Sequence, residues 1–130
     1  MNKVVVESRL NGDTTTNLRF VLWCCRALLV REGKHAIASH MICPWFMDDS
    51  NSNERDQGIA WEWVWEPYVP HMFFCDLGWS RGMLAARDKC MKEQIPYDEL
   101  TLAKYDPDMW EFFLQQHWPP HTVGFQLEEQ

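Results

Sequence analysis

The stretch "FFCDLGWSRGMLAARDKC", residues 73–90, has the residue types of an anion-binding turn. An apolar run leads into a glycine turn at Gly78, and Ser80, Arg81 and Gly82 then open a predicted helix. The N-terminus of a helix offers unbonded N–H groups and the positive end of the helix dipole, both of which favour a bound anion. A hydroxyl, a guanidinium fork and an unobstructed glycine N–H suit phosphate oxygens. The stretch therefore predicts a site for a phosphorylated ligand.

A plainer interpretation of the same residues stays open. Ser80 is a good N-cap, so its hydroxyl can serve only to start the helix. Arg81 can instead pair with Asp48, Asp49 or Glu54. Under this interpretation the stretch organises the fold and binds no ligand.

The rest of the chain alternates between short apolar runs and amphipathic segments. In chain order, we expect a strand at 3–8, a helix at 17–31, a strand at 35–40, a helix from 53 to before Pro67, a strand at 71–76, a helix at 80–94, a strand at 97–102 and a last helix at 108–117. Parallel strands need crossover connections, usually right-handed helices. The alternation therefore predicts an α/β fold: a mainly parallel sheet of four to five strands between two helical layers. We expect residues 1–104 to form this domain, and residues 105–130 to be a helical and extended tail packed on it or on a partner subunit.

Ligands of open α/β sheets bind beyond the carboxyl ends of the strands, where the strand order reverses. The hydrogen-bonding residues at the predicted strand ends are Glu7, Ser8, Ser39, His40 and Asp76. A Ser or Asp at one such position, taken alone, is better explained as a cap or turn residue. Because three strands all end in such residues, we expect them to converge on one ligand site.

The predicted loop from Met41 to Asn53 is long for a simple connection, and loops of that length in a compact domain are often functional. We expect it to cover the ligand site as a lid. Asp48 and Asp49 would then accept hydrogen bonds from sugar hydroxyls or hold Arg81.

Several of these motifs occur together in one known group of proteins. "VVVES", "NGD", "ASH", "DD" with "ER", and above all "DLGWSRGM" resemble small bacterial and phage proteins related to the nucleoside 2-deoxyribosyltransferase-like family. The resemblance spans about Val4 to Leu100. It implies a flavodoxin-like or Rossmann-like three-layer sandwich that binds a nucleoside or nucleotide. It also implies that Gly12 and Asp13 of "NGD" and the turn from Gly78 to Met83 contact the ligand.

The catalytic members of that family carry an Asp-x-Gly-Thr-x-x-Glu pattern, in which the final acid attacks the anomeric carbon. The corresponding positions here are Asp76, Gly78 and Gly82, so a glycine occupies the nucleophile position. A glycine cannot form the covalent glycosyl intermediate that a carboxylate forms. If catalysis persists, Glu7 and Asp76 are the acids that would divide the roles of proton donor and charge stabiliser, with His40 as a third titratable group.

Two functions follow from the resemblance, and a third follows from composition. The first is a nucleoside- or nucleotide-recognising protein that cleaves or transfers at the N-glycosidic bond. The second is a non-catalytic protein that sequesters a nucleotide or sugar-nucleotide. The third is an aromatic-rich interaction protein without a small ligand, since the chain has 8 tryptophans. Crowded aromatics also favour a homo-oligomer interface.

Composition argues against several other functions. A net charge of -7 disfavours binding to DNA or RNA, which needs clustered cations. The 5 cysteines form no CxxC pair, and no apolar run approaches the length of a membrane span, so we expect a cytoplasmic protein that binds no membrane. The histidines lack ligand spacing and the Asp48-Asp49 pair lacks an EF-hand pattern, so we expect no metal and no cofactor.

Overall fold

The computed structural model describes residues 2–10, 12–38, 48, 50–54, 56, 57, 60 and 68–120. The elements in chain order are β1 (Lys3–Glu7), α1 (Thr14–Glu32), β2 (His35–Ile37), β3 (His71–Phe74), α3 (Arg81–Glu93), β4 (Tyr97–Leu100), α4 (Leu102–Tyr105) and α5 (Pro107–Leu114). The helix predicted from Asn53 and the loop predicted from Met41 fall mostly outside the described residues. Of the residues described there, 52–54, 56, 57 and 60 are helical.

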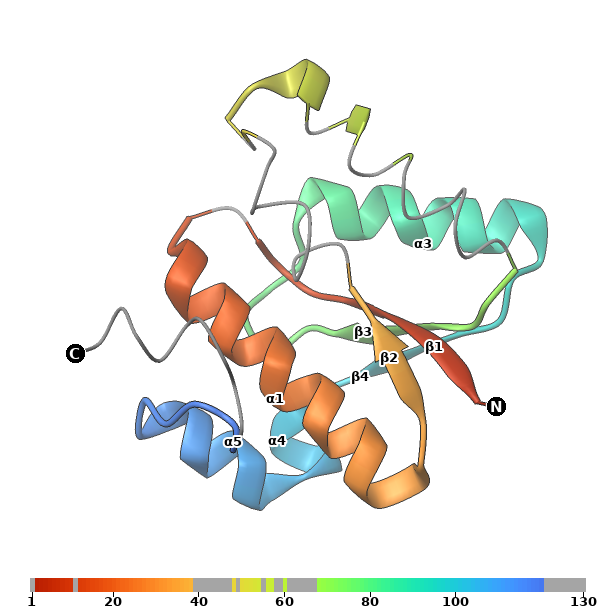
Figure 1. The fold of residues 1–130 in the computed structure, drawn as a ribbon. Coiled ribbons are helices and arrows are strands. Elements are labelled where there is room, and N and C mark those ends of the chain that lie inside the picture. Colours follow the sequence, from red (N-terminus) through yellow and green to blue (C-terminus); the bar gives the residue numbers. More distant parts are fainter. Residues whose placement is uncertain are drawn as a thin grey trace.

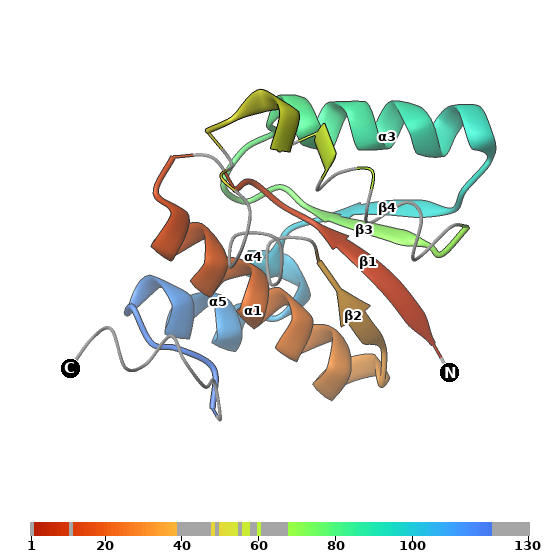
Figure 2. The same cartoon turned by 45° about the horizontal axis from the view of Figure 1, so that its top comes forward.

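The four strands form one parallel sheet in the order β2-β1-β3-β4. Helix α1 covers one face together with α4 and α5, and α3 covers the other (Figures 1 and 2). The predicted three-layer α/β sandwich with a parallel sheet is therefore confirmed. None of the helices in the described part of the chain is long and apolar enough to cross a membrane.

Helix α1 begins three residues before the predicted start because Asp13 caps it. Asp13 Oδ1 accepts the Thr16 backbone N–H at 3.1 Å, and Asp13 Oδ2 accepts the Thr16 hydroxyl at 2.7 Å. The helix ends at Gly33, which has a φ of 64° and donates its N–H to carbonyl oxygens of the last turn. Such a left-handed conformation favours glycine. The cap and the stop both lie where the sequence places Asp and Gly.

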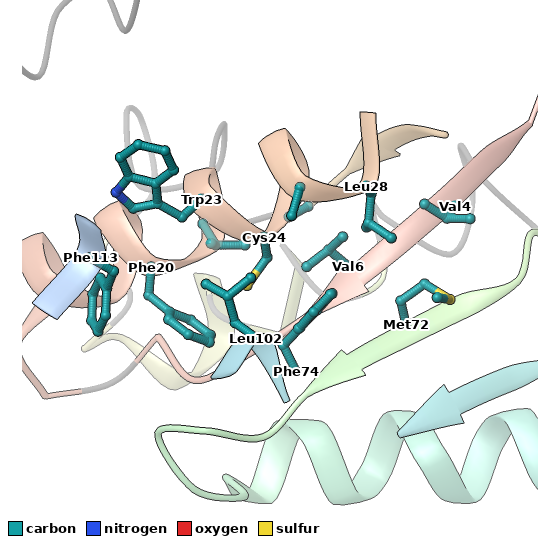
Figure 3. Close-up of a cluster of buried hydrophobic side chains, with 13 residues drawn as sticks. Val4, Val6, Phe20, Trp23, Cys24, Leu28, Met72, Phe74, Leu102 and Phe113 are labelled. Carbon is teal, nitrogen blue, oxygen red and sulfur yellow. The ribbon is translucent and has the colours of Figure 1, made fainter. Parts of the chain in front are cut away.

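The larger core lies between α1 and the sheet (Figure 3). The strands contribute alternate residues to it, among them Val6 of β1 and Phe74 of β3, and α1 contributes Phe20 and Leu28. The central strand residues are buried on both faces, as expected of a parallel sheet covered by helices. This packing fixes the positions of β1 and β3 relative to α1.

The second core lies between α3 and the other face of the sheet. Phe73 of β3 is fully buried there against the α3 side chains Met83, Ala86 and Cys90. Trp79, just before α3, stacks on Phe73 with the ring centroids 5.4 Å apart. The start of α3 is therefore anchored to the central part of the sheet.

The segment after β4 continues the α1-side core. Phe113 of α5 and Leu102 of α4 belong to the same buried cluster as Phe20 and Phe74. The Trp23 indole N–H donates to the carbonyl oxygen of His117 at 2.7 Å, across 94 residues of chain. Part of the predicted tail is thus integrated into the core.

The strand predicted at 97–102 is wrong at its end, because β4 stops at Leu100 and α4 begins at Leu102. Asp76, which follows β3, accepts the backbone N–H groups of Leu102 at 2.7 Å and Ala103 at 3.0 Å. A carboxylate at this position satisfies the first N–H groups of a helix. The long-range contact from Asp76 therefore favours a helical turn where the local sequence favours a strand.

Candidate functional site

The strand order places a crossover point between β1 and β3. From β1 the chain passes through α1 to β2 on one side, and later returns to β3 on the other side. The connections that follow β1 and β3 lead to helices on opposite faces of the sheet (Figure 1). In doubly wound folds this is the position where ligands bind. The residues after β1 and β3 are therefore the first to consider.

These two connections touch each other through Arg9 and Gly78. Arg9 Nη1 would lie 3.3 Å from a Cβ atom added to Gly78, which has a φ of 96°. A side chain at this position would be both strained and crowded, so the turn needs glycine. Arg9 was not among the residues singled out in the sequence. The signal was present, because Arg9 follows directly on the strand end that supplies Glu7 and Ser8.

The N-terminus of α3 adjoins this contact. Ser80 is the N-cap, and its Oγ accepts the Met83 backbone N–H at 3.2 Å. The plainer interpretation of Ser80 as a cap is therefore correct, although its hydroxyl hydrogen remains able to donate to a ligand. Arg81 and Gly82 follow and are exposed. A Cβ atom on Gly82 would approach Ser80 Oγ only to 3.8 Å, so a larger residue would fit there.

The expected pairing of Arg81 with an acid is not seen for Asp48 or Glu54. Asp48 Oδ1 instead accepts the Ser50 backbone N–H at 3.0 Å, and Glu54 accepts the backbone N–H of Asp48 at 3.3 Å. Within the described ranges, neither Arg9 nor Arg81 forms an ion pair or a hydrogen bond. Two exposed guanidinium groups thus lie at the crossover without an acidic partner among these residues.

Glu7 and Asp76 lie at the same edge of the sheet, as predicted, but each already contacts other groups of the protein. Both oxygens of Asp76 are held by the backbone of α4. Glu7 Oε1 lies 3.2 Å from Nδ1 of His71, whose side chain is 1% exposed. The register pairs Val5 with His71, so Glu7 and His71 project from the same face of the sheet. The role of His71 as a partner of Glu7 was not foreseen.

The remaining predicted residues are distributed as follows. Gly12 has a φ of 104° with open space where a side chain would be, and Asp13 caps α1. Ser8 is buried, and Met83 is buried in the α3 core beside Phe73. The structure therefore brings the turn from Gly78 to Gly82 to the crossover but not the side chain of Met83.

Three predicted residues, Ser39, His40 and Asp49, lie outside the described residues. No group of three or more His, Cys, Asp and Glu side chains that could hold a metal ion occurs in the part of the chain that is described. The guanidinium groups and the helix N–H groups at the crossover can bind an anion.

Comparison with known proteins places the chain in one family. A family model with the description "Domain of unknown function (DUF7768)" matches residues 2–100, a range that contains β1 to β4 and excludes α4 and α5. No curated protein and no solved structure matches the chain. On the family match, which covers most of its length, the chain belongs to the DUF7768 family.

Proposed function

We propose that this protein binds a nucleotide at the β1/β3 crossover, with a phosphate group at the N-terminus of α3. The observation that carries the proposal is the approach of the Arg9 guanidinium to the Gly78 turn, because that turn leads directly into α3, which begins at the exposed Arg81. The nucleoside part of the ligand rests on the resemblance of "DLGWSRGM" to nucleoside 2-deoxyribosyltransferase-like proteins.

Charge supports an anionic ligand at this position. Arg9 and Arg81 have no acidic partner among the described residues, although the chain carries 19 acidic and 12 basic residues, so their charges are available to an anionic ligand. A hydrogen bond between a charged pair contributes about 1.5–3 kcal/mol, and a helix N-terminus adds about 0.3–1 kcal/mol for a nearby anion. A nucleoside without phosphate would gain neither contribution.

The carboxylates near the crossover favour binding over catalysis. In the resemblance to nucleoside 2-deoxyribosyltransferase-like proteins, Gly82 occupies the position of the nucleophilic acid. The carboxylate oxygens of Asp76 already cap α4. Sequestration of a nucleotide or sugar-nucleotide is therefore the better-supported function. Cleavage of the N-glycosidic bond remains a second candidate because Glu7 ends β1 at this edge and contacts an imidazole that can exchange a proton with it.

A thermal-shift screen against nucleosides, nucleotides and dinucleotides tests the proposal, since a ligand that binds only the native state raises the melting temperature. We expect nucleotides to raise it and the matched nucleosides to raise it less. Each hit is then incubated with the protein and analysed by chromatography. The absence of free base supports sequestration, and its appearance shows N-glycosidic cleavage. A screen in which no nucleotide raises the melting temperature would overturn the proposal.

A further inference from the structure

A second candidate site is a groove of about 310 Å³ between α1, β2 and Pro119. His35 is the first residue of β2, and the groove residues of α1 come from its middle and last turns. Because the strands are parallel, this position is toward their amino ends, whereas the β1/β3 crossover lies at their carboxyl ends (Figure 1). The two sites are therefore separate.

The groove has an apolar surface. Leu22 and Leu29 of α1 line it from one side and Ala36 of β2 from the other. Leu29 is 45% exposed, although it is a large aliphatic residue in a helix whose other side packs against the sheet. Desolvation raises the pKa of the Cys25 thiol, which also lines the groove, to about 12. The thiol is therefore protonated at neutral pH and adds no negative charge.

The charged residues that line the groove are Arg26 and Lys34, and His35 lies beside them. Among the described residues, no acidic side chain lines the groove. Lys34 Nζ lies 3.5 Å from Glu32 Oε1 and forms an ion pair with it. Arg26 makes no ion pair or hydrogen bond within the described part of the chain. Arg26 is half-buried, and a guanidinium in that position is stabilised by a bound anion.

We propose that this groove binds a small amphipathic carboxylate, a molecule with one carboxylate group and an aliphatic or aromatic body. The carboxylate would pair with Arg26, flanked by Lys34 and His35, and the apolar body would lie against Leu22 and Leu29. A volume of about 310 Å³ is at the lower end of small-ligand sites, which favours a compact acid over a peptide. The proposal does not depend on nucleotide binding at the crossover.

Calorimetry with octanoate, at concentrations below those at which it forms micelles, tests the proposal directly. We expect saturable binding to the full chain, and binding of 1-octanol, which has the same alkyl body without the charge, to be at least about tenfold weaker. Octanoate should bind with the same affinity in the presence of a nucleotide. This separates the outcome from that of the crossover site.

Two variants identify the groove as the place of binding. Arg26→Gln should weaken octanoate binding by about tenfold or more and leave 1-octanol binding unchanged. Leu29→Glu, at a position exposed enough to accept the change, should repel octanoate by placing a carboxylate in the groove. Lys92→Gln is the control, because it removes one positive charge from the last turn of α3 on the opposite face of the sheet. It should bind octanoate as the unaltered protein does.

Far-UV circular dichroism and thermal unfolding establish that each variant is folded before it is titrated. Absence of saturable octanoate binding would overturn the proposal, as would equal affinities for octanoate and 1-octanol. Unchanged octanoate binding by both Arg26→Gln and Leu29→Glu would also overturn it. Binding of octanoate only after removal of residues 121–130 would identify that segment as the occupant of the groove, and would contradict a small-molecule ligand.

Discussion

The carboxylate of Asp76, at the end of β3, accepts the backbone N–H of Leu102 at 2.7 Å and so starts α4. Leu102 is fully buried, and its side chain joins the core beneath α1. Asp76 thus connects the end of β3 to the helices that follow β4.

Replacing Asp76 should therefore affect stability first. Asp76→Ala should lower the free energy of unfolding by about 2 kcal/mol, because a helix loses its cap and a buried N–H loses its partner. Urea denaturation measures the effect. Asp88→Ala, at an exposed position of α3, is the control and should change it by less than about 0.5 kcal/mol. If Asp76→Ala unfolds as the unaltered protein does, the capping role is wrong.

Phe113 tests whether the segment after β4 belongs to the core. Its side chain is 5% exposed and packs against Phe20 with the ring centroids 5.2 Å apart, whereas the neighbouring Phe112 is 45% exposed. Phe113→Ala should lower the free energy of unfolding by about 3–5 kcal/mol. Phe112→Ala should cost clearly less. Equal losses in chemical denaturation would mean that α5 is not packed as described.

A substitution at Gly78 tests whether this glycine is needed for nucleotide binding or only for the turn. Gly78→Ala should weaken nucleotide binding, because the added Cβ would approach the Arg9 guanidinium to 3.3 Å at a φ of 96°. Gly33→Ala is the matched control, since Gly33 also has a positive φ, of 64°, but has open space around it. Both variants should lose stability, by about 1–2 kcal/mol for Gly33→Ala. If both bind nucleotide equally well, Gly78 is needed only for the turn.

The contact between Tyr105 and Glu32 predicts a pH-dependent contribution to stability. The Tyr105 hydroxyl donates to Oε2 of Glu32, and this hydrogen bond, with smaller help from Lys34 and Arg31, lowers the pKa of the Glu32 carboxyl. A carboxyl with a lowered pKa in the folded state stabilises the protein above its unfolded pKa of about 4.3, and the stabilisation is lost as the pH falls through the folded pKa.

The measurement is urea denaturation of the unaltered protein and of Tyr105→Phe at pH 7 and pH 3. The destabilisation caused by Tyr105→Phe should be present at pH 7 and smaller at pH 3. Tyr97→Phe, whose ring packs against Phe73, is the control and should show no such difference between the two pH values. A loss for Tyr105→Phe that is the same at both pH values would assign it to ring packing alone.

The fold was accessible from the sequence because its signals are local. The β-branched run at β1, the cap at Asp13 and the stop at Gly33 each act within a few residues, and together they specify strand, helix and strand in order. Met83 was also accessible. It lies at helical spacing from Ala86 and Cys90, which marks it as part of the buried face of α3 and not as a ligand contact.

The features that sequence reasoning missed depend on which strands are neighbours. Glu7 and His71 meet because Val5 pairs with His71, and this register is not visible in either segment alone. The helical turn at Leu102 depends on Asp76, which lies 26 residues earlier in the chain. Arg9 reaches Gly78 only because β1 and β3 are adjacent. The detailed partners within the site therefore had to come from the structure.

The central claim is phosphate recognition at the crossover, and calorimetry with a nucleoside and its 5′-monophosphate tests it most directly. Arg81→Ala should weaken nucleotide binding by about 1.5–3 kcal/mol and nucleoside binding much less, because only the phosphate meets the guanidinium. Arg81→Lys should recover part of the loss, since an ammonium lacks the planar fork. Lys92→Ala, at the other end of the same helix, should bind both ligands normally. Equal losses of nucleoside and nucleotide affinity in Arg81→Ala would contradict the account.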